Sequence, residues 1–538
     1  MNQGGTADKC FYSSLTECIS LSRTFLFSKT PLTEIEVQRS LYYTYLEELI
    51  MKIQPTYAQV EKIAADGHYN VLPVSLEILS DFTTPIETMK ILKNVSTHCY
   101  MLESAQANET WGRYTFLGFD PKMEITCVDG KMKIGNLKVK TDNPSDYLRQ
   151  ILADYKSPRF DYLPSFTGGL VGYFSYDYLT YSEPTVKCDV EDTEAFKDVD
   201  LMLFDKVIAF DHLRQKIILI VNMPLDEPET GYNKAVMELN QLAELLRYGE
   251  KKNEPGGKLL GEVKPLFDKE QFCGMIEKAK CHIHEGDIFQ IVLSNRLCAP
   301  FEGSLLNTYR VLRSINPSPY MFYFSGTDVE VAGASPETLA RLENGVLHTF
   351  PLAGTRPKGK TEEEDNALEA ELLADEKELA EHNMLVDLGR NDLGKISRFG
   401  TVQVEKLHSI ERFSHVMHIG STVRGEISEN HDALDAIEAV LPAGTLSGAP
   451  KIRACQLIGE LENNKRGIYG GAIGYIDFTG NMDTCIAIRI AYKKNGKVFV
   501  RSGAGIVADS VPEKEFEECL NKAKSSLKAL ELAQEAEL

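Results

Sequence analysis

Two pairs of glutamates have a spacing that could hold a metal ion. Glu378 and Glu381 lie within the stretch LLADEKELAEHNMLVDLGRND, and Glu515 and Glu518 lie close to the C-terminus. Residues three apart on an α-helix face the same side, so each pair would direct its carboxylates together. Four convergent carboxylates repel one another unless a hard cation lies among them, and oxygen ligands suit magnesium. A solvated acidic face is the alternative interpretation of each pair.

Capping signals predict a helix at each pair. Thr361, followed by Glu364, matches a capping box that would begin one long helix, and Gly389 would end it, leaving Arg390 to Asp392 just beyond. Pro512 suits the first turn of a last helix that runs to about residue 536. Both pairs would then stand on regular helices, far apart in the sequence.

A glycine-rich run and two histidines invite other interpretations. Residues 501–508 match the loosened dinucleotide pattern G-x-G-x-x-A. We reject it, because Pro512 begins the next helix too late and no second parallel strand follows. Backbone N–H groups at Gly503 and Gly505 would instead approach an anion, with a plain tight turn as the alternative. His415 and His418 lack a Cys or a third His at zinc-ligand spacing, so structural or orienting roles are favoured.

Composition indicates an ordinary globular protein. The 538 residues are enough for about three or four domains, with 43% hydrophobic and 25% charged residues. A net charge of -21 argues against nucleic acid or an anionic membrane as partner. No apolar run reaches the roughly 18 residues of a membrane span. The 11 cysteines form no C-x-x-C pair and no signal peptide precedes them, so we expect a cytoplasmic protein with reduced thiols.

Strand and helix patterns alternate without strict βαβ order, which favours an α+β fold. The Lys-, Pro- and Gly-containing segment 249–263 is the best linker. It would separate an N-terminal lobe, 51–248, from a C-terminal lobe, 264–538. Residues 10–27 show no sustained period, and the helix-like stretch 34–50 runs directly into Met51. For residues 1–50 we expect a disordered extension, or a translated leader if the native start is Met51.

Several short runs together are too specific for chance. In chain order they are GDIFQIVLS (from residue 286), ASPE (334), PLAGTR (351), EHNMLVDLGRND (381), PAGTLSGAPK (442) and YGG (469). With them the chain resembles the chorismate-utilising enzymes, most closely the large subunits that form anthranilate, from about Met51 to the end. The resemblance implies large antiparallel β-sheets packed face to face, with helices outside.

The resemblance also implies a reaction. Ammonia would add at C2 of chorismate while the C4 hydroxyl leaves, and elimination of pyruvate would give anthranilate for tryptophan biosynthesis. Glu381 and Glu518 match direct magnesium ligands, with Glu378 and Glu515 supporting them. Glu337 matches the general acid for the departing hydroxyl, a role that needs a carboxyl protonated near neutral pH.

Other positions match substrate contacts. His418 would orient the ring during substitution and elimination. The enolpyruvyl carboxylate would be held by guanidinium, phenol and backbone groups, for which a guanidinium fork and paired amides are apt. The residues at these positions are Tyr469, Arg489, Gly503, Ala504 and Gly505. Gly354, Thr355 and Thr445 match further substrate contacts.

Two positions separate this reaction from those of related enzymes. Relatives that add water carry a lysine where this chain has Gln290, since water needs a general base and ammonia does not. Aminodeoxychorismate synthases typically carry a nucleophilic lysine at the position of Ala353, which cannot form that adduct. The resemblance therefore implies ammonia as nucleophile. A binding or regulatory protein without turnover is the competing class.

The resemblance also implies a partner subunit that supplies ammonia and an effector that regulates the enzyme. The chain shows no G-x-C-x-G segment, so a separate glutamine amidotransferase subunit would supply ammonia. Two runs, 101–104 and 316–321, resemble those that form a tryptophan feedback pocket, with ordinary strand packing as the alternative. The effector residues would be Ser104, Pro319, Tyr320 and Met321.

Overall fold

The computed structural model describes residues 52–104, 112–186, 190–412 and 416–535. The predicted extension at 1–50 and His415 therefore lie outside the described residues. No helix in the described ranges is long and apolar enough to cross a membrane.

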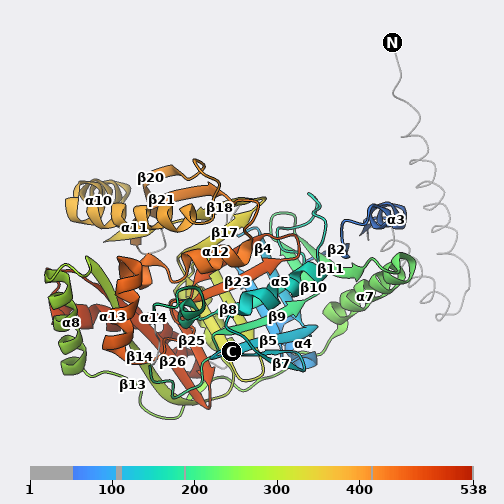
Figure 1. Ribbon diagram of the computed structural model, residues 1–538. Helices are drawn as coiled ribbons and strands as arrows, with labels where there is room; N and C mark the ends of the chain where they lie inside the picture. Colours follow the sequence, from blue (N-terminus) through green and yellow to red (C-terminus); the bar gives the residue numbers. More distant parts are fainter. Residues whose placement is uncertain (1–51, 105–111, 187–189, 413–415, 536–538) are drawn as a thin grey trace, which may run out of the picture. The chain divides into compact units, whose positions relative to one another are not determined.

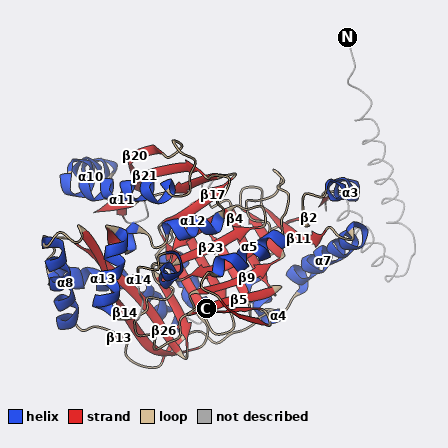
Figure 2. Cartoon of the chain, viewed as in Figure 1, coloured by secondary structure: helices blue, strands red, loops and turns tan. Residues whose placement is uncertain are grey.

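Two large antiparallel sheets form the body of the protein (Figures 1 and 2). The first has, in spatial order, β1 (Ile53–Gln54), β2 (Val71–Leu79), β11 (Lys216–Pro224), β10 (Lys206–Asp211), β4 (Tyr114–Phe119), β3 (Cys99–Glu103), β15 (Tyr320–Ser325), β16 (Glu330–Ser335), β25 (Ile490–Lys494), β26 (Lys497–Ile506), β14 (Gln290–Glu302) and β12 (Lys258–Leu259), with β13 (Lys264–Pro265) and β22 (Gly448–Ala449) paired to β14. The second has β19 (Leu352–Pro357), β21 (Val416–Glu426), β18 (Val346–Thr349), β17 (Thr338–Glu343), β24 (Met482–Ile486), β23 (Ala472–Asp477), β8 (Gly169–Phe174), β9 (Val199–Phe204), β5 (Met123–Val128), β6 (Lys131–Ile134) and β7 (Leu137–Lys140), with β20 (Gln403–Arg412) paired to β21.

Aromatic side chains from both sheets meet in one core. Tyr100 of the first sheet and Phe204 of the second are in contact, with ring centroids 4.7 Å apart. Phe166 is fully buried between Phe116 and Tyr475, which also come from different sheets. Large aromatic rings bury the most apolar area per residue, so this layer stabilises the packing of the sheets. The predicted α+β fold with sheets packed face to face is confirmed.

The helices lie around the sheets (Figure 2). They are α3 (Tyr57–Asp66), α4 (Pro85–Val95), α5 (Pro144–Asp154), α6 (Leu179–Ser182), α7 (Pro228–Tyr248), α8 (Lys269–His284), α9 (Leu306–Ile315), α10 (Glu362–Ala374), α11 (Glu376–Gly394), α12 (Ala433–Val440), α13 (Lys451–Glu462) and α14 (Pro512–Glu535), with single 3-10 turns η1 (Tyr176–Tyr178) and η2 (Gly444–Leu446). The last helix, α14, packs against β26, α8 and α9.

The predicted long helix from Thr361 to Gly389 is wrong in two respects. It is divided at Asp375, whose Oδ1 accepts hydrogen bonds from the N–H groups of Lys377 (3.1 Å) and Glu378 (3.2 Å). An Asp that caps two N–H groups begins a new helix, which is why α11 starts there. The second helix, α11, does not end at Gly389 but continues to Gly394. Gly389 packs closely on Thr349 within this helix. Thr361 does cap α10, through a bond from Glu364 N–H.

The glycine-rich run 501–506 is part of β26, antiparallel to β14. The rejection of a dinucleotide site is therefore confirmed, and the alternative of a tight turn is wrong. Pairing with a long neighbouring strand keeps this segment extended.

The predicted linker contains β12, which pairs with β14. Strand β3, before the linker, pairs with β15, after it. Residues Ile53–Leu538 form one compact unit, so the division into two lobes at 249–263 stays a prediction.

Candidate active site

The two glutamate pairs stand on different helices, α11 and α14. Burial raises the pKa of Glu378 on α11, and the charge of Glu381 raises it further. Burial and Glu518 likewise raise the pKa of Glu515 on α14, whereas the charge of Lys377, from α11, lowers it. Lys377 on α11 is therefore within electrostatic range of Glu515 on α14.

Strand β14 connects Glu381 to the glycine-rich strand. Gln290 Nε2 donates to Glu381 Oε1 at 3.2 Å. A Cβ on Gly505 would lie 2.9 Å from the same Nε2, so only a glycine allows the amide to lie here without displacement. Gln290 Oε1 is buried and has no hydrogen-bond partner among the described residues. Residues 290, 381 and 505 therefore come together from three separate elements.

The acidic residues fit a hard cation. Their donors are carboxylate oxygens. Burial raises the pKa of Glu378 and Glu515, and repulsion from the other glutamate of each pair raises it further, which a bound cation would relieve. Glu518 pairs with Lys522 at 2.8 Å. No three of the four carboxylates lie within 4.8 Å of one another, so the side chains are not gathered around a single point.

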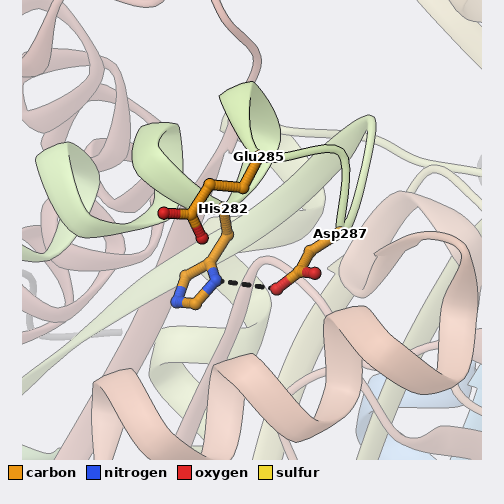
Figure 3. A group of neighbouring side chains, drawn as sticks. All are labelled: His282, Glu285 and Asp287. Carbon is orange, nitrogen blue, oxygen red and sulfur yellow. Dashed lines mark hydrogen bonds and ion pairs between the residues drawn. The ribbon is translucent and has the colours of Figure 1, made fainter.

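One other group in the described part of the chain does bring three possible ligand atoms within 4.8 Å: His282, Glu285 and Asp287 at the end of α8 (Figure 3). Asp287 Oδ2 lies 2.9 Å from His282 Nδ1 and 3.0 Å from Arg453 Nη2. The Arg453 guanidinium thus already pairs with the carboxylate, and we interpret the group as a hydrogen-bonded charge network just before β14.

Glu337 has the properties of an acid that is protonated near neutral pH. It lies between β16 and β17 and borders a cavity together with Thr445. Burial raises its pKa to about 7, against the opposing effects of a hydrogen bond from Thr445 and the charges of Arg489 and Lys522. Thr445 Oγ1 donates to Glu337 Oε1 at 2.9 Å. The carboxyl can therefore give up a proton at physiological pH.

His418 is held as a neutral ring. Its Nδ1 lies 2.9 Å from Gly354 O and 3.1 Å from Thr355 Oγ1. Burial lowers its pKa, and the charge of Arg489 lowers it further. Donation from Nδ1–H to the Gly354 carbonyl leaves Nε2 unprotonated. Gly354 itself has φ +64 and approaches Glu378, which a side chain there would obstruct.

Tyr469 and Arg489 border the same region. A Cβ on Gly503 would lie 3.0 Å from the Tyr469 hydroxyl oxygen, so this phenol lies directly over the glycine-rich strand. Burial lowers the pKa of Arg489, and Glu337 partly restores it. Ala504 is fully buried and packs in the core with Leu293, because side chains alternate between the faces of a strand. Only its backbone is available to a ligand.

Lys522 was not predicted from the sequence. It lies one turn after Glu518 on α14, and its charge lowers the pKa of both Glu337 and Glu515. The signal was present as Glu-x-x-x-Lys, the spacing of a helical ion pair. That spacing is common on exposed helices, so it does not reveal which lysine faces a site.

The four predicted effector residues line one cavity. Ser104, Pro319, Tyr320 and Met321 border it together with residues of β17, β23 and β24. Tyr320 Oη lies 2.8 Å from Asp483 Oδ1 and 2.9 Å from Thr338 Oγ1. The cavity contains both apolar surface and buried charge, which suits a small amphipathic ligand.

Comparison with known proteins agrees with this geometry. A family described as chorismate binding enzyme matches residues 97–528. "Anthranilate synthase component 1" of Acetivibrio thermocellus is 46% identical over 501 residues, covering 89% of this chain and 99% of that protein. The chain belongs to the chorismate binding enzyme family. The protein of the same name from Aquifex aeolicus is 44% identical over 503 residues, covering 90% and 100%.

Solved structures of the family have the same fold. The crystal structure of anthranilate synthase component I from Streptococcus pneumoniae is 38% identical, with a TM-score of 0.70 over 84% of this chain and 98% of that one. MenF, the menaquinone-specific isochorismate synthase of Escherichia coli, has a TM-score of 0.65 at 19% identity, covering 88% and 100%. That second likeness concerns the fold alone. The resemblance to the chorismate-utilising enzymes, inferred from short motifs, is confirmed.

Proposed function

We propose that this member of the chorismate binding enzyme family converts chorismate and ammonia into anthranilate and pyruvate. The observation that carries the proposal is the group formed by Gln290, Glu381 and Gly505, in a chain whose near full-length relatives bear the name anthranilate synthase component 1.

Each residue has a role in the proposed reaction. Tyr469, Arg489 and the backbone N–H groups of 503–505 hold the enolpyruvyl carboxylate. Glu337, with a pKa of about 7, gives its proton to the departing C4 hydroxyl. His418, kept neutral with its proton on Nδ1, orients the ring.

Magnesium is the cofactor in this proposal. Glu381 and Glu518 would bind it, with Glu378 and Glu515 supporting them directly or through water. When bound, the ion supplies positive charge for the ring carboxylate. The oxygen-only donors and the raised pKa values of Glu378 and Glu515 support this assignment.

Gln290 supports ammonia as the nucleophile. Its side chain is buried and bonded to Glu381, and an amide cannot act as a general base toward water. Ala353, on β19, has no nucleophilic group. These two residues disfavour isochorismate and aminodeoxychorismate as products.

A second subunit and a feedback ligand complete the proposal. The designation component 1 of the relatives implies another component, and we assign it the glutaminase activity that releases ammonia. Tryptophan is the proposed occupant of the cavity bordered by Ser104, Pro319, Tyr320 and Met321.

The test is a turnover assay with free ammonium. Purified protein, chorismate, magnesium and ammonium salt should give the fluorescence of anthranilate, and tryptophan should suppress it. Glu337→Gln is the matched inactive control, because it keeps the shape of the side chain and removes the proton. Exclusive formation of isochorismate or aminodeoxychorismate, or binding of chorismate without turnover, would refute the proposal.

A further inference from the structure

A buried charged cluster lies behind the predicted carboxylate-binding residues. Glu462 ends α13, and the guanidinium groups of Arg466 and Arg501 bond to its carboxylate; all three side chains are at most 2% exposed. In Figure 1, α13, which carries Glu462, lies beside β14, and β14 lies beside β26, which carries Arg501; Arg466 follows α13. The proposed reaction uses none of the three.

Arg466 joins two parts of the site. Its Nη1 donates to the Leu446 carbonyl at 2.6 Å, and its Nη2 donates to the Val292 carbonyl at 2.8 Å. Its Nε donates to Glu462 Oε2 at 3.0 Å. Leu446 directly follows Thr445, and Val292 is on β14. The planar guanidinium thereby fixes the distance between the Thr445 turn and that strand, which a lysine could not do.

Arg466 also lies against Tyr469. Its guanidinium carbon is 5.9 Å from the centroid of the Tyr469 ring and 4.5 Å from that of Tyr176. A cation near an aromatic face is attracted to the ring. Burial raises the pKa of Tyr469, and the charge of Arg466 opposes this, which makes the phenol a better hydrogen-bond donor. That phenol is the one placed over Gly503.

Glu462 fixes the arginines to the strand pair. Its Oε1 accepts from the backbone N (2.8 Å) and Oγ (3.0 Å) of Ser294, and its Oε2 accepts from Arg501 Nη2 at 2.7 Å. Ser294 pairs with Gly503 across β14 and β26. Two guanidiniums share this carboxylate, and the buried carboxyl of Asp177, which accepts from Gly467 N–H at 2.7 Å, is also within electrostatic range of Arg501. The charged groups therefore connect α13, the segment 463–467 and the β14–β26 pair.

We propose that Arg466 is a positioning residue for substrate binding. Together with Glu462 and Arg501, it holds Tyr469 over Gly503 and fixes the Thr445 turn relative to β14, next to the site that receives a substrate carboxylate. This inference rests on the proposed function, because it concerns the carboxylate of the same substrate.

The test separates positioning from a general structural role. Arg466→Lys keeps the charge but cannot bridge both carbonyls, so we expect KM for chorismate to rise about tenfold or more while kcat changes much less. In a Tyr469→Phe background the same substitution should add little, because both changes affect one contact. Arg296→Lys is the matched control: this buried arginine is on β14, the strand to which Arg466 bonds, but it stacks on Phe499.

A milder variant covers the case in which Arg466→Lys does not fold, since breaking a buried ion pair is strongly destabilising. Ser294→Ala removes one hydroxyl from Glu462 and should raise KM in the same direction by a smaller factor. The inference would be overturned if Arg466→Lys and Arg296→Lys changed KM equally, or if the effects of Arg466→Lys and Tyr469→Phe were independent. An unchanged KM in Ser294→Ala would also overturn it. Turnover by the wild type tests the proposed function, whereas the ratio of KM in each variant to KM in the wild type tests the positioning role. Failure of one can therefore be distinguished from failure of the other.

Discussion

Removing the hydroxyl of Thr445 should move the pH dependence of the enzyme. Glu337 must be protonated to act as an acid, so kcat/KM should fall above its pKa of about 7. The sign follows from the role: the active form is the protonated carboxyl, which is present below pH 7 and is lost as the pH rises through it. Well above pH 7, the loss approaches about tenfold per pH unit.

The magnitude comes from one hydrogen bond. Thr445 Oγ1 donates to Glu337 Oε1 at 2.9 Å and so stabilises the ionised form. A hydrogen bond to a charged group contributes about 1.5 to 3 kcal/mol, and about 1.4 kcal/mol corresponds to one pH unit. A protonated carboxyl keeps part of the bond. In Thr445→Val the alkaline limb of kcat/KM should therefore move up by about one pH unit.

The assay is anthranilate fluorescence across pH 5.5 to about 9.5, a range chosen to span both sides of the Glu337 transition. Thr349→Val is the control, because Thr349 borders the same cavity but donates to Leu339 O. A KM change caused by loss of a substrate contact would alter the height of the profile and not the position of its limb. An unmoved limb in Thr445→Val, or a limb that persists in Glu337→Gln, would refute the assignment of Glu337.

Three further substitutions test other parts of the molecule. Glu381→Gln should abolish magnesium-dependent turnover with little change in thermal unfolding. Glu376→Gln, at an exposed position at the start of α11, should keep activity. Magnesium titrations of Glu381→Gln and the wild type with the same midpoint would contradict the metal assignment. Ser104→Leu fills part of the effector cavity, so tryptophan should inhibit at least about tenfold more weakly with kcat unchanged, and wild-type inhibition curves would exclude this cavity. Phe166→Ala leaves a void between the sheets and should lower the free energy of unfolding by about 3 to 5 kcal/mol in denaturant titrations; a loss below about 1 kcal/mol would mean that the core collapses to fill it.

Local patterns predicted the elements well where one short segment was enough. Thr361 marked the start of α10 and Pro512 the start of α14, because capping and fixed backbone angles act within one turn. Asp375 was missed as a cap, since it lies inside an otherwise continuous helical pattern. Its two bonds to backbone N–H groups break that helix, and the pattern of apolar residues does not show this.

The site was predictable only in part. The glutamate pairs were predicted from their spacing, and Glu337 and His418 from the resemblance, but Lys522 and Arg466 were not predicted. Both have charges that look solvated in a sequence with 25% charged residues. Arg466 is almost completely buried, and its partners at Leu446, Val292 and Glu462 come from three different elements.

The sequence by itself determined the family, the α+β class and the acidic pairs on two helices, because motifs and capping signals are local. The tertiary structure decided that Gln290, Glu381 and Gly505 meet, and that the glycine-rich run is a strand beneath Tyr469. The physical reason is pairing between distant strands. Antiparallel registers set which residues of β14 and β26 face each other, and those registers depend on the packing of whole sheets.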